Sequence, residues 1–149
     1  MFSTKKTLTL KGAQVLMDAA VAEAARLQVP GAIAIVDDGG HPMLLVRLDD
    51  TMVAAANIAL GKAATAVAFQ RPTIELEKTI LSGRTPMLVL NSATDQAYVP
   101  LKGGYPIRCG DQVVGGIAVA GTLDAEKDEL VARAGLQALV AATADRNPR

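Results

Sequence analysis

A single histidine limits the chemistry that this chain can carry. His41 follows two aspartates and two glycines, residues 37–40, a composition that predicts a tight turn. One imidazole can serve as an axial ligand to a haem iron, as a general base or as an oxyanion donor. It cannot build a zinc site of several histidines, and the one cysteine, Cys109, does not supply the missing ligands. An exposed turn histidine without a chemical role is the alternative interpretation.

Two acidic residues precede this histidine. Asp37 and Asp38 could orient His41, or could act as a paired acid and base in proton transfer. Asp before Gly also closes turns by accepting hydrogen bonds from its own backbone, and this structural interpretation is the stronger of the two. One aspartate could do both.

Arg47 and Lys62 are the best candidates for an anion site. Arg47 ends an apolar run, and Lys62 lies in a stretch dominated by alanine, so both charges stand in apolar surroundings. A guanidinium can bind a carboxylate or a haem propionate through two parallel hydrogen bonds, and an ammonium adds a point charge. The alternative is internal pairing with Asp49 or Asp50, or simple exposure. A buried Lys62 would have a lowered pKa and could act as a base or form a Schiff base.

A glycine-rich segment in the second half offers backbone donors. Gly103, Gly104, Tyr105 and Pro106 could form a loop whose N–H groups approach a ligand closely, although a plain tight turn explains them as well. Tyr98 and Tyr105 could donate to an oxyanion or bind ferric iron. Cys109 is a candidate thiolate ligand to haem, but a lone cysteine on a strand is more often buried packing. The acidic residues 126–129 could attract a hard cation, and a solvated helix start is the simpler interpretation.

Hydrophobic periodicity predicts the elements that must position these residues. We expect helices over residues 9–28, 52–69, 73–81 and 124–144, and strands over 31–36, 42–48, 105–109 and 112–120. Asp49, Asp50 and Thr51 are expected to cap the second helix. Residues 82–100 are expected to be part helix and part loop. The order predicts a single α+β domain over residues 1–149, an antiparallel sheet flanked by helices.

Composition excludes several classes of function. Fifteen basic and fifteen acidic residues give a formal net charge of zero, without the clustered basic excess that nucleic-acid binding needs. No apolar run is long enough to span a membrane, and the N-terminus lacks the apolar region of a secretory signal, so cytoplasmic localisation is expected. Alanine-rich helices without net charge favour burial in an interface, which predicts a homo-oligomer, a dimer or larger.

Several segments together resemble one known family. The segments GAIAIVDDGGHP (31–42), LLVRLDD (44–50), GKAATAVAF (61–69) and GGYPIRCGDQVVGGIAVAG (103–121) occur in one order between an opening and a closing helix. This set resembles the GlcG/HbpS-like family, the haem-degrading or haem-binding domain that also forms the C-terminal domain of some cobalamin adenosyltransferases. The resemblance covers residues 8–139. It implies a profilin-like antiparallel sheet flanked by helices, oligomers, and haem or related tetrapyrroles as ligands of some members.

Three hypotheses about function follow. The leading one is binding of a small, anionic ligand, with haem first, in a cleft near the first hairpin and the Gly103–Gly104 loop, with His41 as axial ligand and propionates on Arg47 or Lys62. The second is a small cofactor-independent enzyme that acts on a carboxylate or oxo-acid in a catabolic pathway, by isomerisation, lyase or proton-transfer chemistry. The third is a non-catalytic assembly or sensor module. The third predicts that these polar residues are scattered in space.

Overall fold

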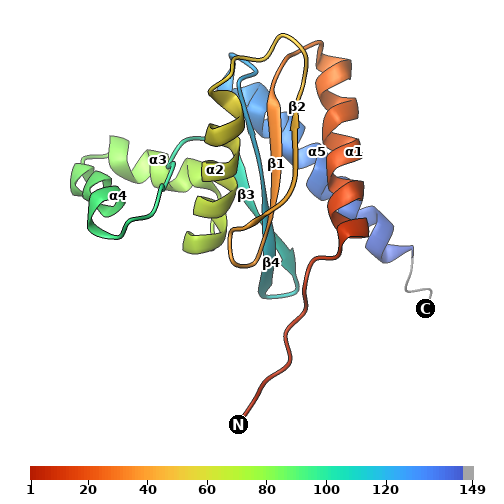
Figure 1. Cartoon of the computed structure of the whole chain (residues 1–149), viewed down its shortest axis with the longest axis horizontal. Helices are drawn as coiled ribbons and strands as arrows, with labels where there is room; N and C mark the ends of the chain where they lie inside the picture. Colours follow the sequence, from red (N-terminus) through yellow and green to blue (C-terminus); the bar gives the residue numbers. More distant parts are fainter. Residues whose placement is uncertain (146–149) are drawn as a thin grey trace.

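The computed structural model describes residues 1–145 as a sheet between two layers of helices (Figure 1). Helices α1 and α5 lie on one side of the sheet, α2 lies on the other, and α3 and α4 project from the α2 side. In chain order the elements are α1 (Leu10–Leu27), β1 (Ala32–Asp37), β2 (Pro42–Arg47), α2 (Ala55–Phe69), α3 (Thr73–Leu81), a 3-10 turn (Thr85–Val89), α4 (Leu90–Ala93), β3 (Gly104–Cys109), β4 (Gln112–Ala120) and α5 (Ala125–Ala144). This is the α+β class that the sequence predicts.

The four strands form one antiparallel sheet in the order β2-β1-β4-β3. Two hairpins supply the strands, and they join along the central pair, where Ala32 lies opposite Ala120 and Asp37 opposite Gly115. The turn of the first hairpin and the turn of the second therefore lie at the same end of the sheet. The start of β3, where Gly104 lies opposite Ala118, is near the other end.

Side-chain alternation in the central strands separates two cores. Ile33, Ile35 and Val119 pack against α1 and α5, whereas Ala34 and Ala118 pack against α2. The residues that face α2 are small, so this helix lies very close to the sheet. A Cβ atom at Gly116 would stand 2.5 Å from the Ala63 carbonyl oxygen. Alanine and glycine on both sides thus set the distance between α2 and the sheet.

Element boundaries differ from the sequence expectation at the start of α2. The helix begins at Ala55 instead of residue 52, and its N-cap position, Ala54, makes no side-chain hydrogen bond. The expected cap, Thr51, instead exchanges hydrogen bonds with the backbone of Gly31, accepting from its N–H (2.8 Å) and donating to its carbonyl (3.1 Å). The capping prediction was therefore wrong, because the hydroxyl ties this loop to the start of β1.

Residues 82–100 contain the 3-10 turn, the short α4 and irregular backbone, as expected for a segment that is part helix and part loop. Asn91 holds this irregular backbone in place, because its side-chain amide bonds both the N–H and the carbonyl of Tyr98. Within residues 1–145, no helix has the length and apolar character needed to cross a membrane.

Candidate functional site

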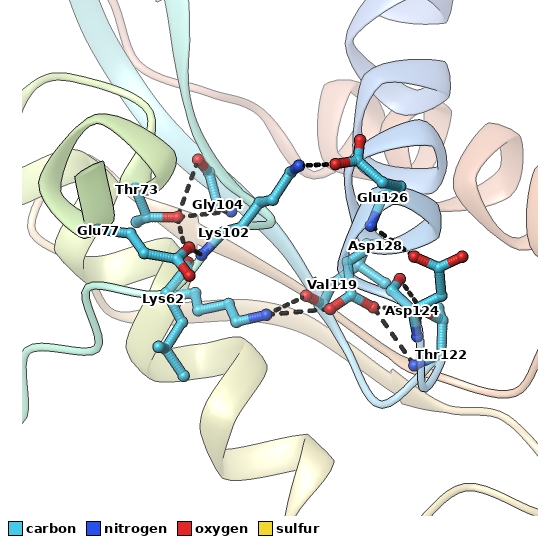
Figure 2. Close-up of polar contacts among 11 residues, drawn as sticks. Lys62, Thr73, Glu77, Lys102, Gly104, Val119, Thr122, Asp124, Glu126 and Asp128 are labelled. Atoms are coloured by element: carbon cyan, nitrogen blue, oxygen red, sulfur yellow. Dashed lines mark hydrogen bonds and ion pairs between the residues drawn. The ribbon is translucent and has the colours of Figure 1, made fainter. Parts of the chain in front are cut away.

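Lys62 lies at the centre of a buried group of polar contacts between α2, β4 and α5, which we name the Lys62 cluster (Lys62, Gly103, Val119, Thr122 and Asp128). The Lys62 side chain is only 4% exposed. Its ammonium donates to the Val119 carbonyl at 2.9 Å and to Asp128 Oδ2 at 3.2 Å (Figure 2). A buried charge without a partner is very costly, so this pair of contacts explains how α2 tolerates a lysine among alanines.

The second oxygen of Asp128 is also occupied. Asp128 Oδ1 accepts from the Thr122 hydroxyl at 2.7 Å and from the Thr122 N–H at 3.3 Å. Thr122 stands in the turn between β4 and α5, and Asp124 caps the helix by accepting from the Glu126 N–H. Both oxygens of the Asp128 carboxylate therefore accept hydrogen bonds from within the protein.

The glycine loop packs directly on this cluster. Gly103 has a left-handed backbone (φ 117°), and a Cβ atom there would stand 2.8 Å from the Val119 carbonyl oxygen and 3.1 Å from Lys62 Nζ. The Gly104 N–H donates to the Thr73 hydroxyl at 2.9 Å, and the Lys102 N–H donates to Glu77 at 2.7 Å (Figure 2). These two backbone donors are therefore bonded to the protein itself and are not directed at a ligand.

Tyr105 lies on the other face of β3, towards α5. Its hydroxyl accepts a hydrogen bond from Arg133 Nε at 3.1 Å, and the guanidinium also lies over the ring. Burial, followed by the neighbouring Glu129 carboxylate, raises the pKa of Tyr105 to about 12. Pro106 is half-buried and lies opposite Gly116 in the ladder. Tyr105 and Pro106 thus both belong to the sheet, and Tyr105 packs in the core on its α5 side.

The His41 turn lies at the opposite end of the sheet. Asp37 Oδ1 accepts from the backbone N–H groups of Gly39 and His41, each at 2.9 Å. The His41 N–H is the main cause that lowers the pKa of Asp37, and Gly39 adds to it. Asp38 pairs with Lys5 at 2.5 Å. Asp37 therefore closes the turn through its backbone N–H groups, as turn chemistry predicts, whereas Asp38 makes an ion pair instead.

Asp37 also faces the His41 ring. Its Oδ1 lies 3.4 Å from His41 Nδ1, while the imidazole as a whole is 80% exposed. A carboxylate on one ring nitrogen favours the tautomer that carries its proton there, which leaves Nε2 available as an acceptor or a metal ligand.

A pocket of about 430 Å³ opens beside this imidazole. Its walls come from the turn, from the C-terminal half of α2 and from the segment that follows α4. Its lining residues are Asp38, Gly39, Gly40, His41, Ala64, Val67, Ala68, Gln96, Ala97 and Tyr98. Of these, the α2 alanines, Val67, Gln96 and Ala97 were not predicted as site residues, since alanine-rich helix and irregular loop carry no chemical signal in the sequence.

Arg47 joins neither group. It ends β2 at one edge of the sheet and lies opposite Ala32, which in turn lies opposite Ala120. Five residues of extended strand, about 17 Å, separate it from the His41 turn, and three strand spacings, about 14 Å, separate it from β3. No ion pair of Arg47 occurs within residues 1–145, so the alternative of pairing with Asp49 or Asp50 does not form, and the side chain is exposed.

The structure thus brings Lys62 together with the Gly103 loop and leaves His41 and Arg47 in separate places. It also corrects one expectation. Residues 126–129 are not simply a solvated helix start, because Asp128 and Glu129 are both buried. The signal for Asp128 was present in the sequence: Asp128, Val131 and Gly135 recur at helical spacing, and all three are buried in α5.

Comparisons with known proteins agree with this fold. The sequence model of a family described as "Haem degrading protein HbpS-like" matches residues 8–137. Protein GlcG of Escherichia coli K12 is 34% identical over 117 residues, which are 78% of this chain and 84% of that protein.

Two solved structures are similar over most of both chains. The Klebsiella pneumoniae protein ORFY has a TM-score of 0.84 at 28% identity, covering 95% of this chain and 97% of that one. A structure described as a PduOC:Heme complex has a TM-score of 0.78 at 30% identity, covering 89% of this chain and 95% of that one.

Proposed function

We propose that this chain, which belongs to the HbpS-like family, binds haem or a related tetrapyrrole in the pocket beside His41. The observation that carries the proposal is the placement of the sole histidine, exposed at the rim of a pocket of about 430 Å³. The PduOC:Heme structure, with the same fold at 30% identity, supports a tetrapyrrole as the ligand class.

The residues of the pocket fit such a group. Gly39, Gly40, Ala64 and Ala68 offer short side chains, or none, against which a flat ring can lie. His41 would supply the nitrogen ligand through Nε2, and the Asp37 carboxylate faces the Nδ1 side of the ring. A carboxylate at the other ring nitrogen commonly orients a metal-binding imidazole in this way. A bound haem would supply an iron centre whose redox state and ligands the surrounding residues tune.

The propionate partners proposed from sequence do not serve this pocket within one chain. Lys62 is buried and already donates to Val119 and Asp128, and Arg47 lies about 17 Å along β2. Lys5 pairs with Asp38, one of the residues that line this pocket. We therefore propose that Lys5 leaves Asp38 and pairs with a propionate when the ligand binds.

The enzyme hypothesis has no comparable support. It needs Arg47 and Lys62 around one substrate together with Asp37, Asp38 or His41. Arg47 lies about 17 Å along β2 from the turn that holds these three residues, and Lys62 is bonded within its own cluster. Lys62 could react only if the Gly103 loop moved away, because its side chain is 4% exposed.

Assembly into a homo-oligomer remains a prediction, and apolar exposure supports it. Leu81, Leu88 and Val89, all exposed, lie on the projecting α3–α4 segment, and Val53 is exposed just before α2. Light scattering at several protein concentrations would measure it, and a monomer at all concentrations would contradict it.

Hemin titration followed by absorbance tests the proposed function. We expect a saturable Soret shift at about one haem per subunit, and its loss or displacement in His41→Ala. Cys109→Ser is the matched control, since Cys109 lies outside the pocket, and it should leave the titration unchanged. A titration that does not saturate, or one that His41→Ala leaves intact, would overturn the proposal.

A further inference from the structure

A second groove lies where the N-terminal segment crosses the β3–β4 hairpin and the last turns of α5 (Figure 1). Its volume is about 490 Å³, within the range of ligand-binding pockets. Leu8, Val114, Leu139 and Val140 form apolar walls. None of its lining residues lines the His41 pocket, so the two can bind ligands independently.

The charges at this groove are all of one sign. Lys6 and Arg108 line it, and no acidic residue does. Lys6 Nζ donates to the thiol of Cys109 (3.5 Å), while Arg108 donates to the carbonyls of Asp111 (3.2 Å) and Gln70 (2.5 Å). Within residues 1–145 neither cation has a carboxylate partner, which leaves two positive charges beside an apolar cavity.

The helix end fixes which way a ligand would lie. Val140 and Thr143 belong to the last turns of α5, whose carbonyl end carries partial negative charge and disfavours an anion. An acidic head therefore belongs at the Lys6–Arg108 end, and an apolar tail belongs against Leu139 and Val140. A guanidinium and an ammonium that line the same groove suit a carboxylate. The guanidinium can bind it through two hydrogen bonds, and the ammonium adds a point charge.

We propose that this groove binds a monocarboxylic acid with an extended apolar body, of the size of a medium-chain fatty acid. The apolar walls provide the affinity, and Lys6 with Arg108 select for the acid over the corresponding alcohol or amine. The site is independent of the tetrapyrrole pocket.

Isothermal titration with decanoate, below its aggregation limit, tests the proposal. We expect saturable binding of decanoate, with decanol and decylamine weaker by about tenfold or more, which corresponds to roughly 1.4 kcal/mol. Lys6→Glu should weaken decanoate by a similar factor. Lys78→Glu, the same charge change on the exposed part of α3, should have no effect.

A second variant tests the cavity itself without depending on charge. Val140 is exposed, so Val140→Trp can fill the groove while the core beneath stays packed, and circular dichroism checks that the fold is kept. We expect this variant to abolish decanoate binding and to leave the hemin titration unchanged. Equal affinity for decanoate and decanol, no saturable heat, or unchanged decanoate binding in Lys6→Glu and Val140→Trp would each overturn the proposal.

Discussion

The Lys62 cluster and the His41 turn use the same kinds of residue with opposite results. Each has an aspartate, a basic side chain and a glycine whose missing Cβ makes room for the basic group. In the Lys62 cluster all of these are buried, and the Asp128 carboxylate receives three hydrogen bonds. At the His41 turn the aspartate bonds the backbone, and the imidazole points to solvent beside a pocket.

The difference separates a structural role from a functional one. A buried charge must be paired, and the charges of the Lys62 cluster are paired within the protein itself, without a ligand. An exposed imidazole held on one side only keeps a nitrogen for a new partner. We therefore expect substitutions in the Lys62 cluster to change stability and substitutions at the His41 turn to change binding.

The largest effect is expected from Lys62→Met. Removing the ammonium leaves the buried Asp128 carboxylate without its charged partner, which costs about 3–5 kcal/mol of unfolding free energy. Urea unfolding measures this cost. Asp128→Asn in the same background should recover part of it, because the uncompensated charge is then gone. A loss below about 1 kcal/mol in Lys62→Met would show that the pair contributes little.

A matched pair of glycine substitutions comes next. Gly103→Ala should cost about 2–3 kcal/mol, because its left-handed φ is strained for alanine and the new Cβ meets a backbone oxygen at 2.8 Å. In Gly39→Ala the new Cβ meets the His41 ring at 2.8 Å and Asp37 Oδ1 at 3.3 Å, and the exposed ring can turn away. Gly103→Ala should lower the free energy of unfolding, whereas Gly39→Ala should change the affinity for hemin. Similar losses of stability in the two variants would contradict the distinction between the Lys62 cluster and the His41 turn.

Alkaline pH should weaken the α5 side of the sheet. Burial holds the pKa of Tyr105 at about 12 in the folded protein, against about 10 for an unfolded tyrosine. Its contribution is therefore complete below about pH 10 and is lost as the pH rises towards 12, on the order of 2 kcal/mol. Unfolding of the wild type and of Tyr105→Phe across this range measures the effect. Parallel curves for the two proteins would contradict it.

The smallest change in stability is expected when acid pH protonates Asp37 in the His41 turn. The lowered pKa of Asp37 means that its stabilisation is present above about pH 4, the unfolded value, and is lost as the pH falls through the folded pKa. Because this side chain is well exposed, solvent screens the interaction and the loss should stay below about 0.5 kcal/mol. Asp37→Asn keeps an oxygen that can accept the same N–H groups, so it should not show this loss. A larger acid effect in the variant than in the wild type would contradict the assignment.

Local sequence patterns predicted the elements well because each was encoded by nearby residues. Short apolar runs in 31–48 and 105–120, glycines at the turns and helical spacing in 10–27 placed the strands and helices to within a few residues. The start of α2 was missed because Thr51 bonds Gly31, a contact across the fold that outweighs the local capping preference.

The candidate site was only partly predictable for the same reason. Lys62 and the Gly103 loop were singled out separately, and only the packing of α2 against β4 shows that they touch. Asp128, the partner of Lys62, lies 66 positions away in sequence, beyond the reach of any local pattern. The walls of the His41 pocket are alanines, valine and loop residues whose types give no indication of a cavity.

The central pairing of β1 with β4 has a consequence for how the chain folds. The first hairpin can form early from neighbouring residues, but its inner strand stays unpaired on one side until residue 120 has been synthesised. Closing so long a loop makes folding slower than in a helical bundle of equal length, and it exposes an apolar strand edge on the nascent chain. During translation, therefore, the Ala32–Asp37 strand is the segment that most needs protection from aggregation.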